Sequence, residues 1–263
     1  MKTLDQLRIA TVQPDLYWED RPSNRSHLQN LINKSMPNPV DLIILPEMFT
    51  TGFTMNAETN AEPAKGETLL WMRSLASELD AALCGSIIVR EKDRYYNRLY
   101  FVWPSGDFET YDKRHTFSYV GEDQFFESGV DRLIVQYRGW KLCPLICYDL
   151  RFPVWSRNTE AFDALIYVAN WPASRTRAWD TLLPARAIEN LCYTIGANRV
   201  GRDDNDILYL GRSVILDPLG ECIAQLEDGA EGLVTGTLEK KELGKIRNKF
   251  RFLDDRDAFV LKS

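Results

Sequence analysis

Histidine is scarce in this sequence: His27 and His115 are the only two among 263 residues. A zinc site built on paired histidines is therefore not expected. The chain also lacks the G-x-x-x-x-G-K-[ST] and G-x-G-x-x-G patterns with which glycine-rich loops bind nucleotide phosphates. The usual sequence signatures of nucleotide binding are thus missing.

Dense runs of positive charge and long apolar runs are also missing. The formal net charge is −6, and without a Lys/Arg run the sequence does not predict a surface that follows nucleic acid phosphates. No apolar run approaches the length of a membrane span, and Met1–Arg8 lacks the apolar core of a secretory signal. We therefore expect neither nucleic acid nor a membrane as a partner.

The cysteines are odd in number, which does not suit a disulfide framework. Most of them lie in apolar, strand-like segments, as in reduced intracellular proteins. The five are Cys84, Cys143, Cys147, Cys192 and Cys222. This usage predicts a cytoplasmic protein.

The composition, with 44% hydrophobic and 27% charged residues, is that of an ordinary globular protein. No repeat of fixed period and no low-complexity linker divides the chain, so we predict one domain over residues 1–263. Apolar periodicity predicts strands at 7–12, 40–45, 82–89, 94–102, 108–112, 133–137, 140–147, 162–169, 193–200, 209–216, 221–225 and 233–238, and helices near 28–36, 69–79, 175–190 and 238–248. This mixed order favours layered sheets with helices outside, an α/β sandwich.

Two polar residues stand at the ends of strongly apolar strands. Glu47 follows one strand in Leu-Pro-Glu-Met, and Cys147 follows another in Ile-Cys-Tyr-Asp. The carboxyl ends of parallel strands commonly meet at one active crevice. A thiol is mostly protonated at neutral pH and needs a base or a cation beside it to react, and Glu47 and Lys113 can supply both. His115 is an alternative base.

Taken singly, these residues have simpler explanations. A cysteine in apolar sequence is often a small buried side chain, and an isolated glutamate or lysine is often a surface charge. Three segments considered together favour a catalytic role for these residues. Leu45-Pro46-Glu47, Tyr111-Asp112-Lys113-Arg114-His115 and Ile146-Cys147-Tyr148-Asp149-Leu150-Arg151-Phe152-Pro153 resemble, in this order, the three signature segments of the nitrilase superfamily.

The resemblance covers nearly the whole chain. Within the superfamily, Cys-Tyr-Asp-Leu-Arg-Phe-Pro-Val-Trp-Ser-Arg-Asn and Ala-Asn-Trp-Pro are similar to the bacterial YafV-type omega-amidases. The resemblance implies a four-layer αββα sandwich, no metal or organic cofactor, and a homodimer or higher homo-oligomer. The C-terminal helix and tail, residues 239–263, can dock on the partner subunit in such an assembly.

The resemblance also implies roles for single residues. They are Cys147 as nucleophile, Glu47 as general base, Lys113 as the group that steadies the tetrahedral oxygen, and Glu122 as an additional structural or catalytic glutamate. Asp123 and Glu127 are the alternatives for that last position.

Substrate-binding residues are expected in the loops that follow the catalytic strands. The backbone N–H of Tyr148 is expected to face the oxyanion. Arg151 or Arg175 is expected to meet a substrate carboxylate. Phe53, Phe117 and Trp171 are expected as walls.

The implied reaction is hydrolysis of the ω-amide of a small 2-oxo acid, such as 2-oxoglutaramate or 2-oxosuccinamate. The products would be the 2-oxo dicarboxylate and ammonia, formed through a cysteine thioester. Two alternatives stay open. An N-carbamoyl amide hydrolase or a nitrilase would keep the same Glu, Lys and Cys, and a catalytically silent dimeric scaffold would use the fold alone.

Overall fold

The structure is a computed structural model and describes residues 3–36 and 38–261. The first two and last two residues of the predicted domain, and with them the end of the predicted C-terminal tail, lie outside the described residues. Two six-strand paths face each other as sheets, and a two-stranded hairpin stands beside them.

The first sheet has parallel strands in its middle and antiparallel strands at its edges. Its order is β15 (Gly232–Glu239), β1 (Gln6–Gln13), β2 (Leu42–Ile44), β4 (Ala82–Glu91), β5 (Arg94–Val102) and β6 (Phe108–Asp112), with the short β3 (Glu62–Pro63) paired to β4. The middle strand β2 consists of three apolar residues that are all buried, as expected for a strand covered on both faces.

The second sheet repeats this plan. Its order is β14 (Cys222–Gln225), β13 (Val214–Leu216), β10 (Tyr193–Ala197), β9 (Ala164–Val168), β8 (Trp140–Ile146) and β7 (Val135–Tyr137). The strands β8, β9 and β10 run parallel, so their carboxyl ends meet at the same edge of this sheet.

Helices cover the outer faces of both sheets. The helices α1 (Arg21–Ser35) and α3 (Glu67–Leu79) bury Leu28, Met72 and neighbouring side chains on the first sheet. The helix α4 (Thr176–Asn190) covers the second sheet. It approaches closely because β10 has Gly196 there; a Cβ atom at that position would lie 2.6 Å from the Trp179 ring.

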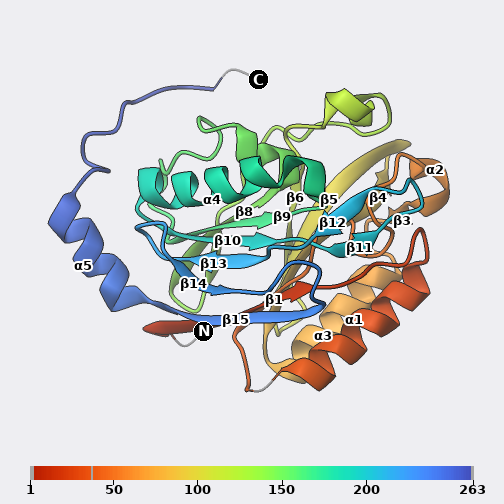
Figure 1. Cartoon of the computed structure of the whole chain (residues 1–263), viewed down its shortest axis with the longest axis horizontal. Coiled ribbons are helices and arrows are strands. Elements are labelled where there is room, and N and C mark those ends of the chain that lie inside the picture. The colour runs from red at the N-terminus through yellow and green to blue at the C-terminus, as the bar shows by residue number, and fades with distance from the viewer. Residues whose placement is uncertain (1–2, 37, 262–263) are drawn as a thin grey trace.

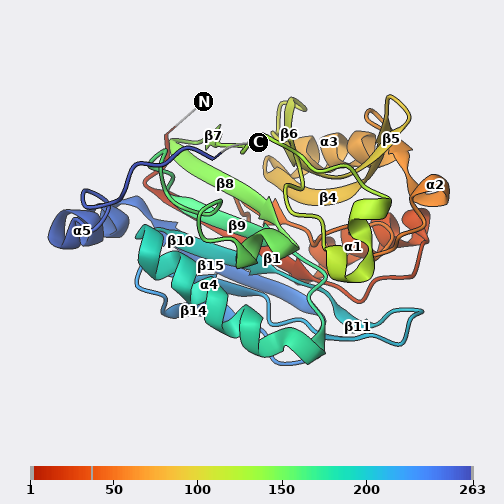
Figure 2. The ribbon, with the colours of Figure 1, turned by 90° about the horizontal axis from the view of Figure 1, so that it is seen from above.

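Figure 1 shows the resulting order of layers: α4, the second sheet, the first sheet, and α1 with α3. Figure 2 shows the same arrangement from above, with α4 on the side opposite to α1 and α3. This is the predicted αββα sandwich. The fold also contains the one-turn helix α2 (Ala57–Asn60) and ends with α5 (Lys240–Phe250), which leads into the tail.

Two predicted strands are wrong in their extent. The strand expected over 193–200 ends at Ala197, and the one expected over 209–216 breaks into β12 (Leu208–Leu210) and β13. The cause is a turn in which Gly211 and Arg212 adopt φ values of 77° and 57°. The side-chain amide of Asn198 donates to the Gly211 carbonyl oxygen and fixes this turn. As a result β12 pairs with β11 (Val200–Arg202) in a separate hairpin.

Within the described residues, no helix combines the length and the apolar character that crossing a membrane requires.

Candidate active site

The predicted catalytic residues come from both sheets. Glu47 follows β2 and Lys113 follows β6 in the first sheet, whereas Cys147 follows β8 in the second. Glu122 begins the 3₁₀ helix η2 (Glu122–Gln124) in the loop after Lys113. The sequence led us to expect strand ends that converge within one crevice; the structure brings them together across two facing sheets.

Three of these side chains form a buried charged cluster. The Nζ of Lys113 lies 2.8 Å from Oε1 of Glu47 and 2.8 Å from Oε2 of Glu122, and all three side chains are fully shielded from solvent. Burial alone would lower the pKa of Lys113, but the charges of Glu122 and Glu47 outweigh it and raise that pKa. Lys113 is therefore a permanent cation at this position.

The structure places Glu122, rather than its two neighbours, in this cluster. Burial raises the pKa of Glu122, and its Oε2 also accepts a hydrogen bond from the backbone N–H of Phe117. Asp123 is exposed, and Glu127 pairs with Arg94 at the surface. Glu122 thus holds both Lys113 and the loop that covers it.

Glu47 is fixed by neutral donors as well as by Lys113. The Nδ2 of Asn97 lies 2.8 Å from Oε1 of Glu47. On the other side, the backbone N–H of Asn170 lies 2.9 Å from Oε2. The carboxylate therefore cannot rotate freely and presents a defined edge to its surroundings.

Cys147 occupies a strained turn. It has a φ of 43°, which non-glycine residues rarely adopt, at the junction between β8 and the 3₁₀ helix η3 (Cys147–Arg151). Such strain is concentrated at functional sites. Burial, followed by the charge of Glu47, raises the pKa of the Cys147 thiol well above its usual range. The resting thiol is therefore protonated and needs a base to react, and Glu47 is the nearby carboxylate whose charge acts on it.

His115, the alternative base, is engaged elsewhere. Its Nδ1 lies 2.7 Å from Oδ1 of Asp149, and its ring stacks on Phe152 with the ring centres 3.5 Å apart. It does not line the cavity beside Cys147. Asp149 also accepts hydrogen bonds from the Ile146 N–H and the Tyr111 hydroxyl, so this pair holds the turn that carries the cysteine.

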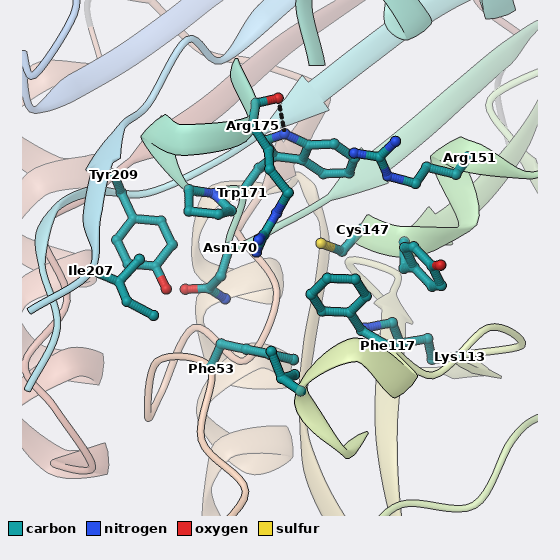
Figure 3. Close-up of a pocket in the computed structure, with 13 residues that line it drawn as sticks. Phe53, Lys113, Phe117, Cys147, Arg151, Asn170, Trp171, Arg175, Ile207 and Tyr209 are labelled. Atoms are coloured by element: carbon teal, nitrogen blue, oxygen red, sulfur yellow. Dashed lines mark hydrogen bonds between the residues drawn. The ribbon is translucent and has the colours of Figure 1, made fainter. Parts of the chain in front are cut away.

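A cavity of about 500 Å³, counted with its open mouth, lies over Cys147. Figure 3 shows its lining side chains, which come from loops at the ends of strands in both sheets and from the β11–β12 hairpin. Besides Cys147 and Lys113, the lining includes all six predicted substrate-binding residues. They are Phe53, Phe117, Tyr148, Arg151, Trp171 and Arg175.

The charge of this cavity has one sign. Lys113, Arg151 and Arg175 line it, and no carboxylate is among its lining residues. The guanidinium of Arg175 lies over the Phe117 ring at 5.0 Å, and that of Arg151 lies over the Trp171 ring at 5.1 Å. Within residues 3–36 and 38–261, neither arginine side chain has an acidic partner. Both are therefore available to an anionic ligand.

Sequence reasoning missed several lining residues, of which Asn170 and Tyr209 are polar. Asn170 lies two residues after the end of β9, at the same sheet edge as Cys147, so its place after an apolar strand was a usable signal. Tyr209 belongs to the β11–β12 hairpin, which the sequence did not predict. In the part of the chain that the structure describes, no group of three or more His, Cys, Asp or Glu side chains is arranged to hold a metal ion.

Comparisons with known proteins agree with this geometry. Residues 8–248 match the family model of the carbon-nitrogen hydrolases. The omega-amidase YafV of Yersinia enterocolitica is 45% identical over 98% of this chain and 100% of its own, and the 2-oxoglutaramate amidase of Bacillus subtilis (strain 168) is 31% identical over 94% and 96%. The crystal structure of XC1258 from Xanthomonas campestris, a CN-hydrolase superfamily protein with an arsenic adduct in its active site, has a TM-score of 0.94 and 41% identity, covering 98% of this chain and 99% of that one. The chain belongs to the carbon-nitrogen hydrolase family, which is the nitrilase superfamily that its sequence motifs predicted.

Proposed function

We propose that this enzyme hydrolyses the ω-amide of a small 2-oxo acid, such as 2-oxoglutaramate, to the 2-oxo dicarboxylate and ammonia. One observation carries the proposal: the side chain of Cys147 faces a cavity that is lined by cations and aromatic rings and, within the described residues, by no carboxylate, while Glu47 is buried close to it. Such a cavity favours a small, anionic acyl compound. The relatives named as an omega-amidase and as a 2-oxoglutaramate amidase support the same substrate class.

The charges suggest how the substrate lies. Its carboxylate pairs with Arg175 or Arg151 at the cavity wall, since a guanidinium binds a carboxylate through two parallel hydrogen bonds. Its amide end then lies at Cys147, between Lys113 and Phe117. The aromatic side chains pack on the short carbon chain between the two ends.

The first half of the reaction forms a thioester. Glu47 accepts the thiol proton while the Cys147 sulfur attacks the amide carbon. The two oxygens of Glu122 can share one N–H of Lys113, which leaves another N–H for the oxyanion. The backbone N–H of Tyr148 lies at the start of η3, where helical N–H groups lack partners within the helix, and it is the second oxyanion donor. The C–N bond breaks as Glu47 returns the proton to the nitrogen, and ammonia leaves.

The second half regenerates the thiol. Glu47 accepts a proton from water as the water oxygen attacks the thioester carbon. The same donors hold the new oxyanion. The C–S bond then breaks, the proton passes from Glu47 to the sulfur, and the product leaves as a carboxylic acid that ionises in water.

The test measures ammonia and carbon dioxide from a panel of substrates. We expect 2-oxoglutaramate and the linear analogue succinamate to release ammonia without carbon dioxide, and Cys147→Ser to release less than a hundredth as much. Carbon dioxide from N-carbamoyl amino acids, with no turnover of the ω-amides, would favour the carbamoyl hydrolase instead. Absence of turnover across the panel, together with a thiol that electrophiles do not modify, would favour the silent scaffold.

We also propose a homodimer. Large apolar side chains are exposed on the α4 side of the molecule, where Val154 and Ile188 are 48% and 50% exposed. Val154 borders a groove that the tail residue Phe259 also lines. Light scattering after gel filtration should give twice the mass of the chain, and Ile188→Lys should shift that mass toward the monomer.

The proposed location is the cytoplasm. All five cysteines are free thiols in the structure, which suits a reducing compartment. Cell fractionation with an antibody to the chain tests this, and recovery in a secreted fraction would contradict it.

A further inference from the structure

The side-chain amide of Asn170 has one polar atom without a partner. Its backbone N–H donates to Oε2 of Glu47 at 2.9 Å, and its Nδ2 donates to the backbone carbonyl oxygen of Glu47. The second contact fixes the orientation of the amide, because Oδ1 in that place would meet another acceptor. Oδ1 therefore points elsewhere, and within the described residues nothing donates to it, although Asn170 is only 4% exposed.

The place to which this oxygen is directed is the catalytic cavity. Asn170 lines the cavity together with Cys147, and Figure 3 shows its amide oxygen on the side of Tyr209 and Ile207, two other residues of the lining. Asn97 offers a contrast. It too donates to Glu47 and has an unpaired Oδ1, but it is not among the lining residues of the cavity.

The cations of the cavity cannot supply all that an amide substrate needs. A primary carboxamide has one carbonyl acceptor and two N–H donors. Lys113, Arg151 and Arg175 only donate, and the two tyrosine hydroxyls of the lining, of which that of Tyr209 donates its proton to Asp203, can each still accept through their oxygen. A buried N–H without an acceptor is costly. Glu47 can accept one N–H, and the second N–H of the leaving group needs a further acceptor. Oδ1 of Asn170 is a buried acceptor of the lining to which nothing donates within the described residues.

We propose that Oδ1 of Asn170 accepts a hydrogen bond from the amide N–H of the substrate, so that Asn170 selects carboxamides over esters of the same acid. This rests on the proposed function, because it assumes that the bound substrate is a primary amide. The contact orients the leaving nitrogen while Glu47 stays free to move the proton.

The same oxygen also serves the second half of the reaction. The tetrahedral intermediate of the second half-reaction carries a hydroxyl group where that of the first carries the amino group. Water must therefore attack the thioester along the path by which ammonia left. The incoming water has two O–H donors, one for Glu47 and one for Oδ1 of Asn170. The acceptor is therefore occupied in both half-reactions.

The experiment compares two substrates that give the same thioester, succinamate and monomethyl succinate. Asn170→Ala should lower kcat/KM for succinamate about 10- to 100-fold, the usual effect of leaving one buried donor unpaired. It should lower kcat/KM for the ester, which has no N–H, no more than about threefold. For the ester the substitution removes only the hydrogen bond from Nδ2 of Asn170 to the Glu47 carbonyl oxygen, which helps to position Glu47. The control Asn97→Ala, which loses a contact to Glu47 away from the cavity, should lower both values by one common factor.

Equal losses for amide and ester in Asn170→Ala, or no loss for either, would overturn the proposal and leave Asn170 a positioning residue for Glu47. If wild-type enzyme leaves succinamate and 2-oxoglutaramate untouched, the proposed function fails instead, so the two failures are distinct. A crystal structure of Cys147→Ala with succinamate needs no change at Asn170. We expect the amide nitrogen about 3 Å from Oδ1, and a nitrogen beyond hydrogen-bond reach would reject the contact.

Discussion

Replacing Asp149 with asparagine should loosen the turn that carries Cys147. The carboxylate of Asp149 is fully buried and accepts four hydrogen bonds. Oδ2 accepts from the Ile146 N–H at 2.9 Å and the Tyr111 hydroxyl at 2.7 Å. Oδ1 accepts from the backbone N–H of His115 at 3.1 Å and from its Nδ1 at 2.7 Å. An asparagine keeps one of these oxygens and puts an N–H₂ group in place of the other.

The chemistry of the partners decides the magnitude. The Tyr111 hydroxyl already accepts hydrogen bonds from the Arg114 N–H and from Nε1 of Trp155, so it must donate to Asp149. In the Asp149→Asn variant the new N–H₂ group therefore has to face His115, where it leaves the backbone N–H unpaired. Losing two hydrogen bonds to a charged acceptor costs about 3 kcal/mol or more. For a chain of this length that corresponds to a fall in Tm of roughly 6–12 °C.

Thermal unfolding monitored by circular dichroism gives the Tm, and ammonia release gives kcat. The control is Asp123→Asn, because Asp123 is exposed and its substitution should change the Tm by less than about 1 °C. At temperatures below the Tm, we expect kcat of Asp149→Asn to be at least about tenfold lower than that of the wild type, since the turn around Cys147 loses hydrogen bonds that hold it. Equal Tm values for the two variants would refute the assignment of Asp149 as the buried anchor of this turn.

Three further predictions concern the charged cluster and the thiol. Glu122→Ala should destabilise the fold by about 3 kcal/mol or more and nearly abolish activity, because it removes a partner of buried Lys113. Urea unfolding and activity assays measure both effects, and the surface variant Glu127→Ala should change neither measurably. Alkylation of Cys147 by iodoacetamide should accelerate about tenfold for each pH unit between 7 and 9, since a raised pKa keeps the thiol protonated there; a rate that is already constant at pH 7 would contradict this. Glu47→Gln should shift that alkylation profile to lower pH, because it removes a negative charge that raises the thiol pKa, while amide hydrolysis is lost; an unchanged profile would show that the charge of Glu47 does not reach the sulfur.

Local sequence pattern predicted most of the regular elements, because the spacing of apolar residues along a segment reflects which of its side chains are buried. The strands predicted at 94–102 and 108–112 have the observed bounds of β5 and β6. The break at Gly211 could not be predicted in this way, because the contact that fixes it comes from Asn198 in another segment. The local sequence of residues 209–216 gives no sign of such a distant contact.

In the candidate site too, local features could be predicted from the sequence and distant contacts could not. The resemblance and the strand ends predicted a site of Glu47, Lys113 and Cys147, and the structure brings their segments together. The hypothesis that His115 is the base arose because the chain has only two histidines and His27 lies in a predicted helix far from a strand end. Asp149, however, engages His115 away from the cavity. Asn170 was missed because its significance depends on Glu47, which lies 123 positions earlier in the chain.

The position of the site between two sheets ties its geometry to the packing of the core. Glu47 and Lys113 belong to the first sheet and Cys147 to the second, so the distance between the sheets sets the distance between base and nucleophile. A misplacement of about 1 Å can cost about 100-fold in rate. Several hydrogen bonds span the gap beside the site, among them those from the Asn170 N–H to Glu47 and from the Tyr111 hydroxyl to Asp149. These contacts fix the spacing where the chemistry needs it, which is why buried residues that never touch the substrate should still control the rate.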